Sequence, residues 1–248
     1  MLDPSLALEL RERPAGKRLM FQRWTDLLFL HYPLDPAIVQ PMIPNGLTVD
    51  TFPDSAGIER AWIGFVPFRI TDLSFGRAKI PTAHSFLETN VRTYVHLEGR
   101  EPGVWFFSLE AESLLAVIGA RASYGLPYWH ADLSLLSSEG TLIYSGRRRG
   151  RRNPAYQVCA SVGEPLGTAE PGAFEFFLVE RYLLYSTWRG RLCRGQVHHR
   201  PYQLFSATFE GCAQDLTEAA GLPSLSFIHA VYSPRVEVDV FPIQKISN

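Results

Sequence analysis

Residues 85–97 read SFLETNVRTYVHL, and their strict alternation divides a predicted β-strand into two faces. One face, suited to packing, carries Leu87, Thr89, Val91, Thr93, Val95 and Leu97. The other face, which we call the polar file, carries Phe86, Glu88, Asn90, Arg92, Tyr94 and His96. An acid, an amide, a guanidinium, a phenol and an imidazole thus follow one another at alternate positions. The stretch predicts a strand with one packing face and one chemical face.

Two interpretations fit the polar file. In an antiparallel sheet with one wet side, it simply faces water. Alternatively, it lines the lumen of a barrel or a cleft, where Glu88 and Arg92, four residues apart, contact one ligand and shift each other's pKa. The alternation alone does not decide between them.

Strand-like segments and turns continue outward from this stretch in both directions. Further strands are predicted at residues 60–70, 103–110, 181–188, 192–210 and 227–241, with a hairpin formed by 131–136 and 141–145. Short helices are predicted at residues 35–42, 112–124, 172–180 and 214–220. Because helices do not separate the strands regularly, we expect a mainly β (α+β) fold, an antiparallel barrel or sandwich, as a single domain over residues 1–248.

Composition and charge exclude several classes of function. A formal net charge of −1 argues against nucleic acid or an anionic membrane as partner. The longest apolar stretch, residues 104–120, contains Glu110 and Glu112 and is therefore not a membrane span. The three cysteines show no CxxC spacing, and the charged first twenty residues lack a signal-peptide core, so we expect a cytoplasmic protein.

The motifs of the common enzyme classes are missing. We find no HExxH, GxSxG, Walker lysine loop or GxGxxG, so we expect no metal and no organic cofactor. His198 and His199 are adjacent on a predicted strand and point to opposite faces, so at most one of them faces any pocket. The arginine run at residues 147–152 is best read as a solvated or acid-paired strand end.

The turn after the predicted helix at residues 112–124 gathers several proton-bearing groups. Arg121, Tyr124, Tyr128 and His130 lie around Gly125-Leu126-Pro127. They form either a site or a tight turn with core tyrosines. For Arg121 we favour a bracing role, because arginines beside tight turns often bond backbone carbonyls.

Four segments together resemble the YqjF-like bacterial proteins, a group without an assigned activity. They are residues 43–47 (IPNGL), 86–95 (FLETNVRTYV), 120–128 (ARASYGLPY) and 180–182 (ERY). That group in turn is similar to acetoacetate decarboxylase at the superfamily level. The resemblance implies a cone-shaped antiparallel β-barrel with a few surrounding helices and an active-site cavity inside.

The resemblance also shows what is missing. In the decarboxylase, an arginine precedes a proline by six residues, and two lysines follow, the first of which forms the Schiff base. Arg121 and Pro127 keep that spacing, but Tyr128 and Trp129 occupy the lysine positions. Neither can form an imine, so acetoacetate decarboxylation by the family route is not expected. Glu88 matches a pocket glutamate of the decarboxylase, which favours an inward-facing polar file.

Two functions follow from these residues, and the sequence leaves open whether any reaction is catalysed. The first is an enzyme acting on a small carbonyl or carboxylate compound without a Schiff base, in which Glu88 and Tyr128 are catalytic. Its expected substrate-binding residues are Asn90, Arg92, Tyr94, Arg121, Trp129 and His130. The second is a non-catalytic binding protein that encloses an apolar or aromatic ligand. The expected partner is a small molecule, and a homo-oligomer is compatible with either function.

Overall fold

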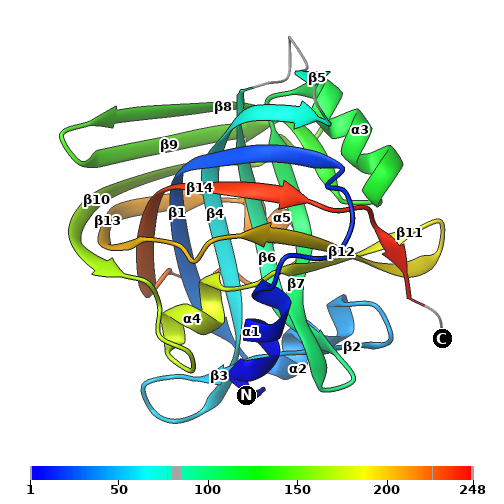
Figure 1. The fold of residues 1–248 in the computed structure, drawn as a ribbon. Coiled ribbons are helices and arrows are strands. Elements are labelled where there is room, and N and C mark those ends of the chain that lie inside the picture. Colours follow the sequence, from blue (N-terminus) through cyan, green and yellow to red (C-terminus); the bar gives the residue numbers. More distant parts are fainter. Residues whose placement is uncertain (1, 77, 80–84, 225, 247–248) are drawn as a thin grey trace.

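The computed structural model of the protein describes residues 2–76, the backbone of 78–79, and residues 85–224 and 226–246. In these residues a mixed sheet of fifteen strands dominates the fold (Figure 1). The strands are β1 (Met20–Leu34), β2 (Leu47–Val49), β3 (Thr51–Pro53), β4 (Glu59–Phe75), β5 (Ala78–Lys79), β6 (Phe86–Leu97), β7 (Arg100–Ala111), β8 (Tyr128–Ser138), β9 (Thr141–Arg148), β10 (Ala155–Gly167), β11 (Leu183–Trp188), β12 (Arg191–His199), β13 (Leu204–Gln214), β14 (His229–Val240) and β15 (Gln244–Lys245). The helices are α1 (Pro4–Arg11), α2 (Pro36–Val39), the 3₁₀ turn η1 (Gln40–Met42), α3 (Leu114–Tyr124), α4 (Phe174–Val179) and α5 (Leu216–Ala219).

The strand pairings return on themselves. From β7 the pairing path runs through β8, β9, β10, β13, β14, β1, β4 and β6, and β6 pairs again with β7. Strand β12 adds a second link, because it pairs with both β11 and β14. The long strands therefore form a closed ring of pairings, and α3 lies at the upper end of β6 and β7 in Figure 1.

Strand β6 is buried on both faces. Its packing side contributes Leu87, Val91 and Val95 to one apolar cluster, whereas Phe86 and Tyr94 belong to another. The polar file therefore does not face bulk water. This rules out the wet-sheet interpretation of the alternation.

Local signals account for the helices beside the sheet. Asp35 accepts a hydrogen bond from the amide of Ala37 at the start of α2. Ser113 caps α3 in the same way, and Gly125 ends it with φ of 64°. A side chain at Gly125 would place its Cβ 2.5 Å from the carbonyl oxygen of Thr187, so both the backbone conformation and the close approach require glycine.

The structure corrects two details of the predicted fold. The sheet is not wholly antiparallel, because β7 pairs in parallel with both β8 and β11. The first of these follows from the crossover through α3, which returns the chain in the same direction. The predicted strand at residues 192–210 is two strands, β12 and β13, separated around Pro201, which has no amide proton for a strand ladder.

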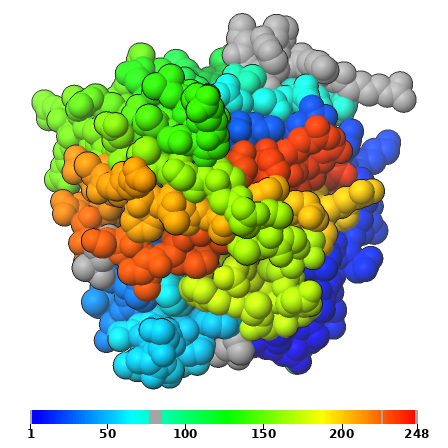
Figure 2. Space-filling view, turned by 90° about the vertical axis from the view of Figure 1, so that its left-hand side faces the viewer, coloured from blue at the N-terminus to red at the C-terminus, as the bar shows by residue number. Residues whose placement is uncertain are grey.

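Segments from distant parts of the sequence cover the surface together. In Figure 2 the orange residues of β13 lie between the green residues of β8 and β9 and the cyan residues that follow β3.

Among the described residues, none of the helices has the length and apolar character needed to cross a bilayer.

Candidate functional site

A cavity of about 430 Å³ lies against the polar file of β6. Its polar wall residues on that strand are Glu88, Asn90 and Arg92. The rest of the wall is mainly apolar and includes Trp24, Leu27, Phe29, Val66, Phe68, Ile70, Leu73, Phe86, Phe106, Leu109, Leu126, Leu184, Val197 and Val240. A concave, apolar space with a few polar groups is the usual form of a small-molecule site.

Glu88 is the central titratable group of the cavity. Its side chain is buried, and Oε2 accepts a hydrogen bond of 2.8 Å from the hydroxyl group of Tyr128. Burial raises the pKa of Glu88 to about 8; the Tyr128 hydrogen bond lowers it, and the nearby Glu110 carboxylate raises it. At neutral pH this carboxyl group is therefore mainly protonated and able to donate.

Tyr128 reaches Glu88 because of the crossover between β7 and β8. Strand β8 begins at Tyr128, opposite Leu109 of β7, while Glu88 lies opposite Ala111 on the other side of β7. Burial raises the pKa of the Tyr128 hydroxyl well above its usual value, and Glu88 adds to the effect. Tyr128 therefore stays protonated and acts only as a hydrogen-bonding group.

Arg92 brings an uncompensated positive charge to the cavity. Nη2 donates to the carbonyl oxygen of Leu178 at 3.2 Å, and the guanidinium lies over the rings of Phe29 and Tyr94 at 5.5 and 5.6 Å. In the described part of the chain no carboxylate pairs with Arg92, and its buried Nε has no partner. The expected coupling to Glu88 is absent from the causes of the Glu88 shift.

Asn90 lies between these two groups on the strand. Its side chain is buried, and its Oδ1 has no hydrogen-bond partner among the described residues. A buried amide without a partner is costly unless a bound water or ligand completes it. Asn90 and Arg92 thus leave unmet hydrogen-bonding capacity in the same wall.

Tyr94, the next member of the polar file, is fully buried and is not part of the cavity wall. Its hydroxyl group lies 2.8 Å from Nε2 of His31, and Nδ1 of His31 lies 3.1 Å from Nδ1 of His229. His229 in turn faces Glu175 at 3.6 Å, so a polar chain runs behind Arg92 toward the surface. Burial holds the pKa of His31 well below its usual value, and it is neutral.

Three other expected ligand-binding residues lie outside the cavity wall. Trp129 points to the opposite side of β8 from Tyr128, is 41% exposed, and lies under the guanidinium groups of Arg121 and Arg148. Nε of Arg121 donates to the carbonyl oxygen of Tyr128 at 2.6 Å, which confirms the bracing role. His130 lies 3.1 Å from the carbonyl oxygen of Glu112.

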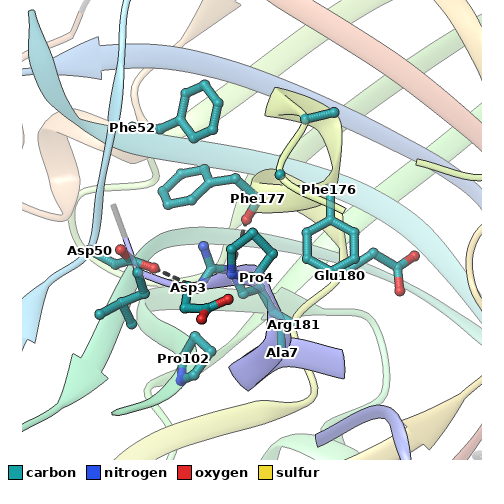
Figure 3. Close-up of a pocket in the computed structure, with 13 residues that line it drawn as sticks. Asp3, Pro4, Ala7, Asp50, Phe52, Pro102, Phe176, Phe177, Glu180 and Arg181 are labelled. Carbon is teal, nitrogen blue, oxygen red and sulfur yellow. Dashed lines mark hydrogen bonds and ion pairs between the residues drawn. The ribbon is translucent and has the colours of Figure 1, made fainter. Parts of the chain in front are cut away.

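A second, much smaller hollow of about 30 Å³ lies under α1 (Figure 3). Its charges already have partners: Nη1 of Arg181 donates to Asp50 at 2.7 Å, and Nε donates to the carbonyl oxygen of Phe177. A space of this size holds about one water molecule and no organic ligand. We therefore take the 430 Å³ cavity against the polar file of β6 as the candidate site.

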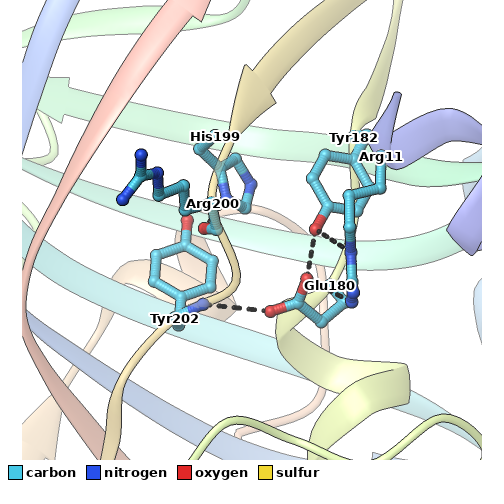
Figure 4. A network of polar contacts seen from close by, with 6 residues as sticks. All are labelled: Arg11, Glu180, Tyr182, His199, Arg200 and Tyr202. Carbon is cyan, nitrogen blue, oxygen red and sulfur yellow. Dashed lines mark hydrogen bonds and ion pairs between the residues drawn. The ribbon is translucent and has the colours of Figure 1, made fainter. Parts of the chain in front are cut away.

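A buried network around Glu180 fixes the N-terminal helix to the sheet (Figure 4). Glu180 is fully buried and accepts hydrogen bonds from Arg11, from the Tyr182 hydroxyl group and from the Tyr202 amide. The ring of His199 stacks on Tyr182 at 4.6 Å. Neither His198 nor His199 lines the cavity.

The arginine run is partly exposed and partly paired with acids, as expected, and Arg147, Arg151 and Arg152 are exposed. Arg148 binds the buried Glu110, and Arg149 binds Asp132 at 2.5 Å. Among the described residues, no cluster of three or more potential metal ligands is found.

The sequence did not reveal the part of the wall formed by β1 and the segment before β13. Trp24 and Phe29 on β1 and Tyr202 line the cavity. The available signal was the apolar run at residues 27–30, which is typical of a strand buried on both faces.

Comparisons with solved structures define the class of fold. The chain has a TM-score of 0.62 with acetoacetate decarboxylase from Legionella pneumophila, at 14% identity over 95% of this chain and 92% of that one. The score is 0.63 with the enduracididine biosynthesis enzyme MppR complexed with pyruvate, at 16% identity over 95% and 93%. The fold is therefore acetoacetate decarboxylase-like.

Sequence comparisons are more specific. The model of the DUF2071 family, described as an uncharacterized conserved protein, matches residues 21–237. The uncharacterized protein YqjF of Bacillus subtilis (strain 168) is 35% identical over 241 residues, covering 94% of this chain and 95% of the relative. The chain belongs to the DUF2071 family, which confirms the resemblance to YqjF-like proteins.

Proposed function

We propose that the protein binds a small carbonyl or carboxylate compound in the 430 Å³ cavity and transfers a proton to it through Glu88. One observation carries this proposal. A carboxyl group whose pKa is about 8 lies in an apolar cavity, held by Tyr128. We also infer that the closed path of strand pairings forms a cone-shaped barrel around this cavity.

The proposed roles follow from the protonation states. The acid form of Glu88 donates its proton to the carbonyl oxygen while a water molecule accepts a proton from the neighbouring carbon, which gives the enol. Return of the enol to the ketone takes a proton or deuteron from solvent and restores the acid form of Glu88, and such transfer is most effective when the pKa lies near the working pH. Tyr128 orients the carboxyl group by donating to Oε2, so it acts on the ligand through Glu88. Arg92 supplies a positive charge to a carboxylate, and the free Oδ1 of Asn90 accepts a hydrogen bond from a hydroxyl group of the ligand or from a bound water.

The structural neighbours support a ligand that carries a carbonyl and a carboxylate group, but they do not support imine chemistry in this chain. MppR was solved with pyruvate, a small keto acid. In the present chain the wall of the cavity contains no lysine among the described side chains, and Lys17 and Lys245 lie elsewhere. The side chain of Lys79 lies outside the described residues. We therefore propose acid–base chemistry without an imine.

The experiment measures hydrogen–deuterium exchange in small ketones and keto acids. The protons that exchange with solvent deuterium are those on the carbon next to the carbonyl group. The wild-type protein is expected to accelerate exchange, and the rate should fall above about pH 8, when Glu88 ionises. Glu88→Gln should abolish the acceleration while the fold stays intact. Glu139→Gln, in the exposed turn between β8 and β9, is the matched control. Exchange that persists in Glu88→Gln would refute the role.

The alternative is a non-catalytic binding protein for an apolar or aromatic ligand. The mainly apolar wall favours it, with Phe29, Phe68 and Phe86 as examples. Binding without any exchange by the wild-type protein would select this alternative.

A further inference from the structure

The register of β4 against β6 shows which end of the cavity lies near solvent and which end lies near Arg92. Along β4 and β6, Ile70 pairs with Phe86, Phe68 with Glu88, Val66 with Asn90, and Gly64 with Arg92. Beyond Ile70, β4 continues through Leu73 to Phe75, which lines the cavity and is 40% exposed. The wall is thus open to solvent on the Phe75 side, and Arg92 lies farthest from that side.

Helices close one end and flank the other. On the open side, α3 contributes Leu115, which is 57% exposed, to the wall. At the opposite end, α4 lies against Arg92 through the carbonyl oxygen of the fully buried Leu178. A ligand that enters beside Phe75 and Leu115 therefore passes Glu88 before it reaches Arg92.

The spacing along β6 sets a length for this path. With a rise of about 3.3 Å per residue, the Cα atoms of Glu88 and Arg92 are roughly 13 Å apart. In the described part of the chain no hydrogen bond or ion pair joins the two side chains. A compound that contacts both groups is therefore longer than a three-carbon keto acid.

The volume and the chemistry of the wall agree with this length. At about 30 Å³ for each water-sized group, 430 Å³ accommodates roughly 14 non-hydrogen atoms. Apart from the polar groups on β6, most side chains in the wall are aliphatic or aromatic. Gly64 lets the side chain of Arg92 pack closely against β4, because a Cβ there would lie 3.2 Å from Cγ of Arg92 and from the Tyr94 hydroxyl group.

We propose that the ligand is an elongated, mainly apolar monocarboxylate of roughly ten to fourteen non-hydrogen atoms, bound with its carboxylate against Arg92 and its chain, which carries the reacting carbonyl group at the level of Glu88, extending toward Phe75 and Leu115. The inference rests on the proposed function, because it assigns the substrate class of the same cavity. Arg92 supplies a positive charge that no carboxylate in the described part of the chain neutralises, and its buried Nε is free to donate. An unpaired guanidinium on apolar walls favours a single carboxylate attached to a hydrophobic chain.

The experiment measures binding of unbranched carboxylates from butanoate to dodecanoate, with primary alcohols of equal length, by calorimetry at pH 7. Kd of the acids is expected to fall about three- to fourfold with each methylene group, until the chain fills the cavity. The alcohols should bind at least tenfold more weakly than the matching acids. Arg92→Met should bring the acids to the level of the alcohols and change alcohol binding less than twofold. The matched control is Arg149→Met, which removes an exposed arginine. It should change neither the binding of the acids nor the binding of the alcohols.

Two further variants keep the test independent of folding defects in Arg92→Met. Arg92→Lys retains the charge and should keep the preference for acids over alcohols. Leu115→Trp, at an exposed position, should shorten the longest chain that still gains affinity. Equal binding of acids and alcohols, or no dependence on chain length, would overturn the inference.

The outcomes separate this inference from the proposed function. If no long-chain acid binds while Glu88-dependent exchange of small keto acids persists, the ligand class is wrong and the proton transfer stands. If the acids bind as expected and no exchange occurs, the ligand class stands and the catalytic role of Glu88 fails.

Discussion

The hydroxyl group of Tyr128 donates to Oε2 of Glu88 at 2.8 Å across 40 residues of sequence. The two residues lie on strands that flank β7 on either side, so the contact depends on the parallel return of the chain after α3. The turn that ends α3 also places the phenol of Tyr128 in the cavity. The same segment is therefore needed both for the fold and for the candidate site.

The stability of the protein should depend on the ionisation of Glu88. Its pKa rises from 4.5 in the unfolded chain to about 8 in the folded protein. The folded state therefore holds a proton that the unfolded state loses, and stability falls as the pH rises from about 4.5 to 8. The expected loss is of the order of 4 kcal/mol.

Urea unfolding of the wild-type protein and Glu88→Gln between pH 5 and 8.5 measures this effect. The free energy of unfolding should fall more steeply with pH in the wild-type protein, since glutamine does not titrate. Glu139→Gln should follow the wild-type curve. Parallel curves for wild type and Glu88→Gln would show that Glu88 is ionised in the folded protein.

Tyr128→Phe should raise the pKa of Glu88 further, because it removes the hydrogen bond that favours the carboxylate. The lost bond should also cost about 1–2 kcal/mol of stability. Infrared titration of the protonated carboxyl band in both proteins measures the shift. An unchanged midpoint would mean that the hydroxyl group does not act on Glu88 in solution.

Much of the fold was predictable from local signals. The alternation at residues 85–97 correctly predicted β6. Ser113 and Gly125 mark the two ends of α3, where the sequence predicted a helix. The burial of both faces of β6 was not predictable, since a file of charged and polar side chains has the same spacing on a wet strand as in a lined cavity. Only the neighbouring strands decide which it is.

For the site, sequence reasoning found Glu88, Asn90, Arg92 and Tyr128, which all lie in the cavity wall. The same reasoning wrongly placed Trp129 in the site. Trp129 is adjacent to Tyr128 in sequence but faces the other side of β8, where it is partly exposed. Sequence reasoning also missed His31, because its pairing with His229 depends on the register of β1 against β14. Such long-range pairings leave no local pattern.

Glu180→Ala should destabilise the protein by about 3–5 kcal/mol and release α1. The substitution leaves Arg11 and the Tyr202 amide without their buried partner. Urea unfolding gives the loss of stability, and limited proteolysis after Arg11 and Arg13 reports the release of α1. Arg11→Met, which removes a partly exposed partner, should cost less. Equal protease resistance in wild type and Glu180→Ala would show that α1 is held by other contacts.

Treatment with borohydride in the presence of acetoacetate or pyruvate should leave the mass of the protein unchanged. Trapping needs an amine in the cavity, and Tyr128 cannot form an imine. Mass spectrometry of the intact chain is the measurement, and Lys79→Arg controls for the lysine whose side chain is not described. A stable mass increase in the wild-type protein would contradict chemistry without a Schiff base.

Because β6 is enclosed on both sides, its odd and even positions can be varied for different purposes. Replacing Glu88, Asn90 and Arg92 together changes what the cavity accepts, while Leu87, Val91 and Val95 stay in a separate apolar cluster. A library restricted to every second codon of this one strand would therefore explore new ligand preferences while leaving the opposite layer of the scaffold intact.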